Sequence, residues 1–335
     1  MKLKPIDQQV VVIIGASSGI GRETALQFAK RGAKLVIAAR NDEALATLKT
    51  EITQLGGSAT SIAADASDPA QMRAVAAAAI ETYGRIDTWV HVAGVAMYAR
   101  FADHTPEEFK QIIDVNLLGQ AYGAMAALPY MRQNGGALIH ISSVVARVAI
   151  PLISAYSSSK HGVSGFVKAL RLELAHEKVP ISVTEVMPAA INTPFFNHAR
   201  TKLGVKPMGT PPFYQPSVVA AAIVSAAEHP IREIYAGGAS KMLSLMQRFT
   251  PRLMDMVLLA TAFKGQRTDE PKSADAPSNL FEPSRDDTRI EGDFGKQAMG
   301  SVYTKVATNP TARLGTLLAS VVGGAAFVAA KLRRS

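Results

Sequence analysis

Short apolar runs alternate with longer helical patterns over the first 240 residues of this 335-residue chain. The runs contain many β-branched residues and some have no polar face, which is typical of strands buried on both sides in a parallel sheet. Seven segments fit this description: Val10–Ile14, Lys34–Ala39, Ser58–Ala63, Thr88–Val92, Ala137–Ile141, Ile181–Met187 and Glu233–Ala236. The alternation of strand and helix predicts an α/β fold, a doubly wound parallel sheet of the Rossmann type with about seven strands.

Two of the intervening helices have recognisable starts. Asp68 precedes Pro69, so a capping carboxylate stands before a residue whose φ already suits a first helical turn. Thr105 is followed by Pro106 and then by Glu108, which is the pattern of a capping box. Both signals support strand–helix–strand units, whose crossovers we expect to be right-handed.

The pattern changes after residue 240. Residues 242–263 are apolar with a helical period, but the charges and the proline among them exclude a membrane span. Residues 264–312 are polar and hold four prolines without a sustained period, which indicates a linker or a tail that embraces the first domain. We therefore divide the chain into a Rossmann-type domain (1–240), a helical and polar extension (241–312) and a hydrophobic C-terminal helix with a basic end (313–335).

The last of these segments leaves two interpretations open. Residues 314–330 carry no charge and would span about 25 Å as a helix, short of a hydrocarbon core of about 30 Å. Snorkelling of Arg313 and Lys331 would lengthen the span and attach the protein to a membrane. Alternatively, Gly315, Gly323 and Gly324 would let the helix pack closely on another helix, either in a dimer or at the chain's own active site. We expect a homo-oligomer. The N-terminal apolar run is too short for a signal peptide, so we expect the Rossmann-type domain in the cytoplasm.

The amino-acid composition excludes several kinds of functional site. The chain has no cysteine, which excludes disulfides, a thiol nucleophile and thiolate metal sites, and its seven histidines are scattered. We expect no metal. The net charge of +9 divides into 22 basic against 18 acidic residues (+4) in 1–240, and 14 against 9 (+5) in 241–335. No basic run with interleaved aromatic residues accompanies this excess, so we expect no nucleic-acid partner.

A glycine-rich loop joins the first predicted strand to the first predicted helix. Its glycines permit a tight turn, a close approach of backbone to a pyrophosphate and close helix–strand packing, and the helix N-terminus attracts the negative charge. The loop predicts a dinucleotide site that contains Gly15, Ser17, Ser18, Gly19, Ile20 and Gly21.

The end of the second strand selects the dinucleotide. Arg40 stands nineteen residues after Gly21, where an NAD site usually has an acid for the ribose hydroxyl. A guanidinium would bond a 2′-phosphate that an acid would repel, so we expect NADP rather than NAD. Asp65, after the third strand, either accepts from the adenine amino group or merely precedes a helix.

Only one of the eight tyrosines, Tyr156, has a lysine four residues later, Lys160, on the same face of a helix. Lowering the pKa of a phenol from about 10 to neutrality needs about 4 kcal/mol. An ammonium about 4 Å away supplies about that much at an effective dielectric constant near 20. We therefore expect Lys160 to lower the pKa of Tyr156.

Two more residues complete the pattern: Ser143 ends a predicted strand thirteen residues before Tyr156, and Asn116 interrupts a helical region. Together with the glycine loop, this order of residues over 8–238 resembles the short-chain dehydrogenase/reductase family in its classical form. The resemblance implies that Tyr156 is the acid and base of a hydride transfer between NADP(H) and a carbonyl or alcohol, and that Ser143 orients the carbonyl oxygen.

The same resemblance assigns supporting roles. Lys160 would also hold the nicotinamide ribose, and Asn116 would support a water that links Lys160 to solvent. The remaining cofactor contacts that it implies are Ala93, Gly94, Pro188, Ile191 and Thr193. Ser142 competes with Ser143 for the same role, and His161 is expected to face away from the site.

Two departures from the family pattern stand out. His91-Val92 replaces the usual Asn-Asn before Ala93-Gly94, which should weaken a network that braces the strands. Pro188-Ala189 replaces the usual Pro-Gly, which could alter the loop beside the nicotinamide.

The loop 192–215 is expected to bear on the substrate. It carries Phe195, Phe196, Phe213 and Tyr214, which either line a site for an apolar ketone or alcohol or pack on each other. Two other functions compete with a carbonyl reductase: a non-catalytic dinucleotide sensor or scaffold, and an epimerase or dehydratase of the extended branch of the family. A sensor or scaffold would be expected to lack Ser143, Tyr156 or Lys160. An extended-branch enzyme would be expected to have a different spacing of glycines.

Overall fold

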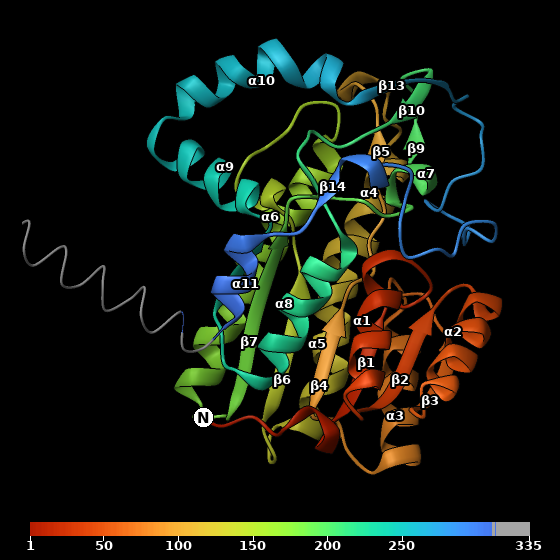
Figure 1. Ribbon diagram of the computed structural model, residues 1–335, viewed down its shortest axis with the longest axis vertical. Helices are drawn as coiled ribbons and strands as arrows, with labels where there is room; N and C mark the ends of the chain where they lie inside the picture. The colour runs from red at the N-terminus through yellow and green to blue at the C-terminus, as the bar shows by residue number, and fades with distance from the viewer. Residues whose placement is uncertain (310–311, 313–335) are drawn as a thin grey trace, which may run out of the picture.

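The computed structural model describes residues 1–309 and 312. Its centre is a sheet of seven strands, all paired in parallel, in the order β12-β7-β6-β4-β1-β2-β3 (Figure 1). The strands are β1 (Val10–Ile14), β2 (Lys34–Ala39), β3 (Ser58–Ala63), β4 (Thr88–His91), β6 (Gly136–Ile141), β7 (Ile181–Pro188) and β12 (Glu233–Ala236). The predicted fold class is confirmed, and each predicted strand ends within one residue of the observed bounds.

Helices cover both faces of this sheet (Figure 1). One buried cluster joins the sheet to α1 (Gly19–Lys30), α2 (Asp42–Gln54) and α8 (Pro216–Glu228), and a second joins it to α3 (Pro69–Tyr83), α5 (Gly119–Met131) and α6 (Ser154–His176). Consecutive residues of β1 alternate between the two, since Ile13 belongs to the first cluster and Ile14 to the second. That alternation is why the whole run is apolar.

Both predicted helix starts are present. The Asp68 carboxylate accepts hydrogen bonds from the first turn of α3, and Thr105 and Glu108 form a capping box on α4 (Pro106–Ile113). Between α4 and α5 the chain makes a π-helical turn at Asp114–Leu118, which contains Asn116.

The strand order reverses direction beside β1, which lies between β2 and β4. The connection after β1 leads to β2 and the connection after β4 leads to β6, towards opposite edges of the sheet. A crevice therefore opens between β1 and β4 at the carboxyl ends of the strands, where ligands bind in folds of this class. The loops that follow β1, β2, β3, β4 and β6 all meet at this edge.

The chain after β12 forms an extension over that edge. The apolar segment predicted at 242–263 is two helices, α9 (Gly238–Phe249) and α10 (Pro251–Gly265), because Pro251 starts a new helix rather than continuing the first. Residues 267–308 then return across the sheet edge to α11 (Val302–Thr308), which packs on α8 (Figure 1). Of the two readings of residues 264–312, the structure favours the embracing tail.

Short strands fasten this tail to the body. β13 (Arg267–Pro271) pairs with β10 (Val205–Pro207), and β14 (Ala298–Met299) extends a small sheet of β11 (Phe213–Tyr214) and β8 (Ala190–Ile191). Two further short elements, β5 (Met97–Tyr98) and β9 (Arg200–Thr201), pair beside α7 (Phe195–His198).

The predicted hydrophobic helix at 313–335 lies outside the described residues. Within 1–309, no helix combines the length and the apolar character needed to cross a bilayer.

Candidate active site

Two cavities adjoin each other at the carboxyl edge of the sheet. The first is lined by the glycine loop and by the residues that follow β2, β3 and β4, and the second by the residues that follow β6 and by the start of α6. Both are lined by Ile20, Val92, Gly94, Thr193 and Phe195. A ligand that fills the first cavity can therefore meet a second molecule in the other.

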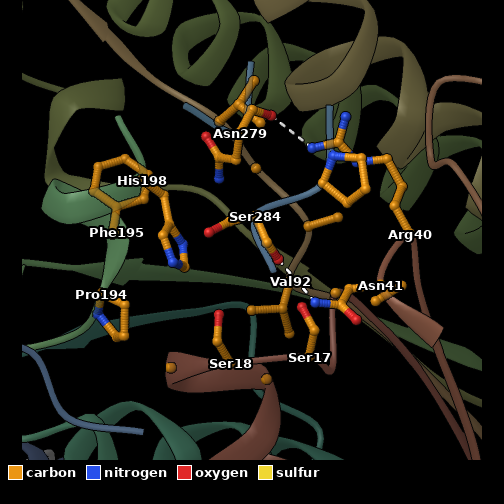
Figure 2. Close-up of a pocket in the computed structure, with 18 of the residues that line it drawn as sticks. Ser17, Ser18, Arg40, Asn41, Val92, Pro194, Phe195, His198, Asn279 and Ser284 are labelled. Carbon is orange, nitrogen blue, oxygen red and sulfur yellow. Dashed lines mark hydrogen bonds between the residues drawn. The ribbon is translucent and has the colours of Figure 1, made fainter. Parts of the chain in front are cut away.

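The glycine loop is shaped as a dinucleotide site requires. Gly15 has φ +89°, and a Cβ on it would lie 2.5 Å from the backbone nitrogen of Ala93. A Cβ on Gly21 would lie 2.0 Å from the carbonyl oxygen of Gly15, so neither position accepts a side chain. Ser18 is the N-cap of α1 and makes no capping bond with its side chain, and the hydroxyls of Ser17 and Ser18 point into the cavity (Figure 2). The loop thus offers hydroxyl donors and a helix N-terminus to an anion.

Arg40 and Asp65 both line the first cavity. The Arg40 guanidinium donates hydrogen bonds to the carbonyl oxygens of Asn279 (2.6 Å) and Phe281 (2.9 Å) and lies 3.9 Å from the Asp65 carboxylate (Figure 2). Asp65 itself accepts from the backbone and hydroxyl of Ser67. Arg40 therefore stands where a 2′-phosphate was expected, but in this structure it holds the C-terminal extension.

The segment 279–294, which we call the strap, closes one side of the first cavity. Its carbonyl oxygens accept from the backbone of Gly19 (at Arg289, 2.9 Å) and from the side chain of Asn41 (at Ser284, 2.8 Å) (Figure 2). Five strap residues line the cavity: Asn279, Pro283, Ser284, Asp287 and Thr288. The sequence did not identify them, because a polar, proline-containing stretch carries no signal for the surface that it covers.

An ionic cluster fastens the strap on its far side. Asp293 accepts from Lys206 (2.7 Å), Asn197 (2.9 Å) and Arg289 (3.0 Å), and Arg289 also bonds Asp287. The hydrogen bond from Lys206 and the other donors lower the pKa of Asp293 to about 2 despite its partial burial. The cluster stays charged at neutral pH, so the strap is fixed at both sides of the cavity.

Ser143, Tyr156 and Lys160 all line the second cavity. The ammonium of Lys160 donates to the carbonyl oxygen of Ile141 (2.9 Å) and lies 5.5 Å from the centre of the Tyr156 ring. Ser142 also lines the cavity, but its hydroxyl donates to the Lys160 carbonyl oxygen (3.4 Å), whereas Ser143 interacts with the Tyr156 hydroxyl. The arrangement places a hydroxyl, a phenol and an ammonium side by side in one cavity.

Burial dominates the acid–base properties of this group. It raises the pKa of Tyr156 to about 12, against an opposing hydrogen bond with Ser143, and lowers the pKa of Lys160 to about 8. The expectation that Lys160 brings the phenol towards neutrality is therefore wrong for this structure. The cost of burying a phenolate outweighs the hydrogen bond with Ser143 that favours it.

Asn116 lies behind the two cavities rather than in either of their linings. Its side-chain amide accepts from the backbone nitrogen of Val95 (2.8 Å) and donates to the carbonyl oxygen of Val95 (2.9 Å) and to Ser159 (3.1 Å). It thus ties the loop after β4 to α6, next to Gly94 on one side and next to Lys160 on the other.

The other predicted cofactor residues fall into place around these. Ala93 lines the first cavity, Pro188 and Ile191 line the second, and Gly94 and Thr193 line both. His161 is exposed and bonds the backbone of its own helix, away from the cavities, as expected. Among the described residues, neither ring nitrogen of the buried His91 has a hydrogen-bond partner, so His91 does not replace the bracing of the asparagine that usually stands there.

The wall of the second cavity is mostly apolar. It includes Phe195, whose ring meets the Tyr156 ring edge-on at 5.8 Å, and Phe196. Phe213 instead packs inside the protein and stacks at 4.4 Å on Phe294, the last residue of the strap. The aromatic side chains of loop 192–215 therefore both line the cavity and pack on each other. Sequence analysis did not identify Tyr98, Leu243 and Gln266, which also line this cavity.

The fold, the glycine loop and the paired cavities define a dinucleotide-binding protein of the Rossmann type. The profile of the family described as short chain dehydrogenase matches residues 9–204, and the chain belongs to this family. The resemblance seen in the sequence is confirmed.

Relatives support this assignment. The chain is 36% identical over 335 residues to the uncharacterized oxidoreductase YxnA of Bacillus subtilis, covering 99% of this chain and 93% of that protein. It is 34% identical over 244 residues to the uncharacterized oxidoreductase Lmo0432 of Listeria monocytogenes, covering 70% of this chain and 98% of that protein. The match to YxnA includes the extension.

Solved structures share the fold. A short chain dehydrogenase/reductase from Burkholderia phymatum, in complex with NAD, superposes with a TM-score of 0.69 at 22% identity over 75% of this chain and 96% of that one. An alcohol dehydrogenase from Thermococcus sibiricus, complexed with 5-hydroxy-NADP, gives 0.60 at 27% identity over 68% and 95%.

Proposed function

We propose that this protein is an NADP(H)-dependent oxidoreductase that interconverts a carbonyl and an alcohol on an apolar small molecule, with Tyr156 as the acid and base. The observation that carries the proposal is the group formed by Tyr156, Ser143 and Lys160 in an apolar cavity that adjoins a dinucleotide cleft. A sensor or scaffold would have no need of all three residues, and the glycine spacing does not favour an epimerase.

The chain's own residues supply the proton and the orientation. A bound nicotinamide supplies or accepts the hydride at the substrate carbon. Ser143 donates a hydrogen bond to the substrate oxygen, and Tyr156 donates its proton to that oxygen as charge develops there. A pKa of about 12 keeps the phenol protonated at neutral pH, which suits the acid needed for carbonyl reduction. Lys160 would hold the ribose of a bound cofactor, and Ile191 and Thr193 would contact its carboxamide. Asn116 fixes the loop beside Lys160.

Arg40 is the residue on which the preference for NADP rests. Its guanidinium is bonded to two uncharged carbonyl oxygens of the extension, Asn279 and Phe281. A 2′-phosphate would offer the same guanidinium a full negative charge and bidentate geometry, which a neutral carbonyl oxygen lacks. Exchange of carbonyl for phosphate would therefore favour NADPH over NADH.

Hydride transfer from NADPH and NADH to a panel of apolar ketones tests the proposal. We expect turnover with NADPH, and Arg40→Asp should shift the ratio of the two cofactors' kcat/KM towards NADH. Lys49→Asp, an exposed charge reversal on α2, is the matched control and should leave that ratio unchanged. Absence of transfer from either cofactor to every ketone would contradict the reaction, and an unchanged ratio in Arg40→Asp would contradict the role of Arg40.

A further inference from the structure

The outer side of α9 and α10 is unusually apolar for an exposed surface. Eight large apolar side chains of these two helices are exposed, among them Met242 (54%), Phe249 (71%), Met256 (66%) and Leu259 (70%). Singly exposed apolar residues are normal on proteins, but a contiguous set on neighbouring helices marks an interaction site.

Helix α10 is the clearest example of this exposed apolar surface. Only Met254 and Ala262 among its fifteen residues are buried, and they stand eight positions apart on a narrow inward stripe. Most of the remaining positions are apolar as well, and they face outwards. A helix that is apolar nearly all round is stable when a second apolar medium covers it, and the described residues provide cover only on the inward stripe.

The charges around this surface are mostly basic. Residues 238–267 contain five basic residues and one acidic residue, a net charge of +4. Arg248, Arg252 and Lys264 are exposed beside the apolar side chains. An apolar surface bordered by basic side chains is typical of segments that lie in the interface of an anionic bilayer.

The position of the two helices suits such an interface. They stand at the carboxyl edge of the sheet and project away from it, so the rest of the described chain leaves their outer side free (Figure 1). Their inner side belongs to the second cavity, since Ala239 and Leu243 of α9 line it and Gln266 follows α10 directly. The two helices therefore form a single layer that separates that cavity from the solvent.

We propose that the outer side of α9 and α10 docks on an anionic lipid bilayer, with its apolar side chains at the boundary of headgroups and acyl chains and its basic side chains among the headgroups. A second copy of the chain fits the surface less well, because a twofold contact would bring two faces of net charge +4 together. Docking would hold the second cavity against the hydrocarbon, where an apolar substrate is most concentrated.

A tryptophan placed in the surface tests this directly on the full chain. The one native tryptophan, Trp89, is fully buried and gives a constant background. In Leu259→Trp, vesicles of phosphatidylcholine with phosphatidylglycerol should shift the added emission to the blue and protect it from acrylamide. Leu172→Trp is the matched control, since Leu172 on α6 is equally exposed (68%), and its emission should not move.

The same experiment has three outcomes that would overturn the proposal. No shift in Leu259→Trp with anionic vesicles means that the surface does not enter a bilayer. A blue shift without vesicles that grows with protein concentration means that a second copy covers the surface. A blue shift without vesicles at all concentrations means that another part of the chain covers it.

Binding to the same vesicles by co-sedimentation measures the two components separately. Leu259→Ser should weaken binding about tenfold or more, by the loss of one buried leucine. Arg252→Gln should weaken it about fivefold, by the loss of one basic residue at the surface, and Lys49→Gln on α2 should not. Equal binding by all three variants would contradict the proposed surface, and neither measurement depends on the catalytic activity.

Discussion

The sheet and the extension are stabilised by different kinds of interaction. In the sheet, all five residues of β1 are 2% exposed or less and each face packs on helices, so side-chain packing provides the stability. In the extension, α10 buries two residues, and the strap is held mainly by its backbone carbonyls and an ionic cluster, with Leu280 and Phe294 as its apolar anchors. The sheet edge thus holds the catalytic side chains rigidly, while the extension controls which ligands reach them.

The largest effect of a substitution is expected at the catalytic side chains of the sheet edge. Ser143→Ala should lower kcat by about 10²- to 10³-fold, the usual effect of removing one donor to a developing oxyanion, with thermal stability unchanged. Ser142→Ala is the matched control, because the Ser142 hydroxyl is engaged by the backbone of α6. Equal losses in the two variants, measured with NADPH and a reactive ketone, would contradict the assignment.

The next effect contrasts packing in the two regions. Phe28→Ala, at a fully buried position of α1, should lower the free energy of unfolding by about 3–5 kcal/mol. Phe249→Ala, at a position of α9 that is 71% exposed, should change it by less than about 0.5 kcal/mol. Denaturant titrations measure both, and a comparable loss in Phe249→Ala would show that the extension is packed far more tightly than the structure indicates.

Acid should destabilise the sheet through a buried histidine. Burial lowers the pKa of His140 to about 3, whereas an imidazole in the unfolded chain titrates near 6.5. Between these values the unfolded chain binds a proton that the folded chain does not, so stability rises with pH through this window and is lost as pH falls.

The variant His140→Gln should flatten that dependence by up to about 1.4 kcal/mol per pH unit. Gln can still bond Gln120, which contacts His140 at 2.9 Å. His161→Gln, at an exposed position, should leave the slope as it is. Unfolding titrations from pH 6.5 downwards test this, and the same slope in wild type and His140→Gln would contradict a neutral buried His140.

The smallest effect concerns the strap. A Cβ at Gly292 would lie 2.4 Å from the carbonyl oxygen of Thr193, so Gly292→Ala should displace the strap from the glycine loop. The Gly19 amide then loses its bond to Arg289, and its hydrogen exchange should quicken about fivefold, as expected for a net hydrogen bond of about 1 kcal/mol. Gly300→Ala, with open space around it, should leave the exchange unchanged. Unaltered exchange in Gly292→Ala would mean that the strap does not protect the loop.

These two regions also differ in how far the sequence predicts them. Strands such as β1 are recognisable because burial on both faces requires every residue to be apolar, and Tyr156 and Lys160 because four residues make one helical turn. The strap could not be predicted, because it binds Arg40 and Gly19 through backbone carbonyls, which are the same in every residue. The raised pKa of Tyr156 was also beyond the sequence, since it depends on how deeply the folded chain buries the phenol.

The central claim is that the Tyr156 hydroxyl provides the proton when hydride is transferred. Tyr156→Phe keeps the ring and its contact with Phe195, so NADPH affinity, measured by fluorescence, should stay within a few-fold of wild type. In a single turnover of the NADPH-loaded enzyme with an apolar ketone, hydride transfer should slow by about 10²- to 10⁴-fold. Transfer at the wild-type rate in Tyr156→Phe, with NADPH bound as tightly, would contradict the account.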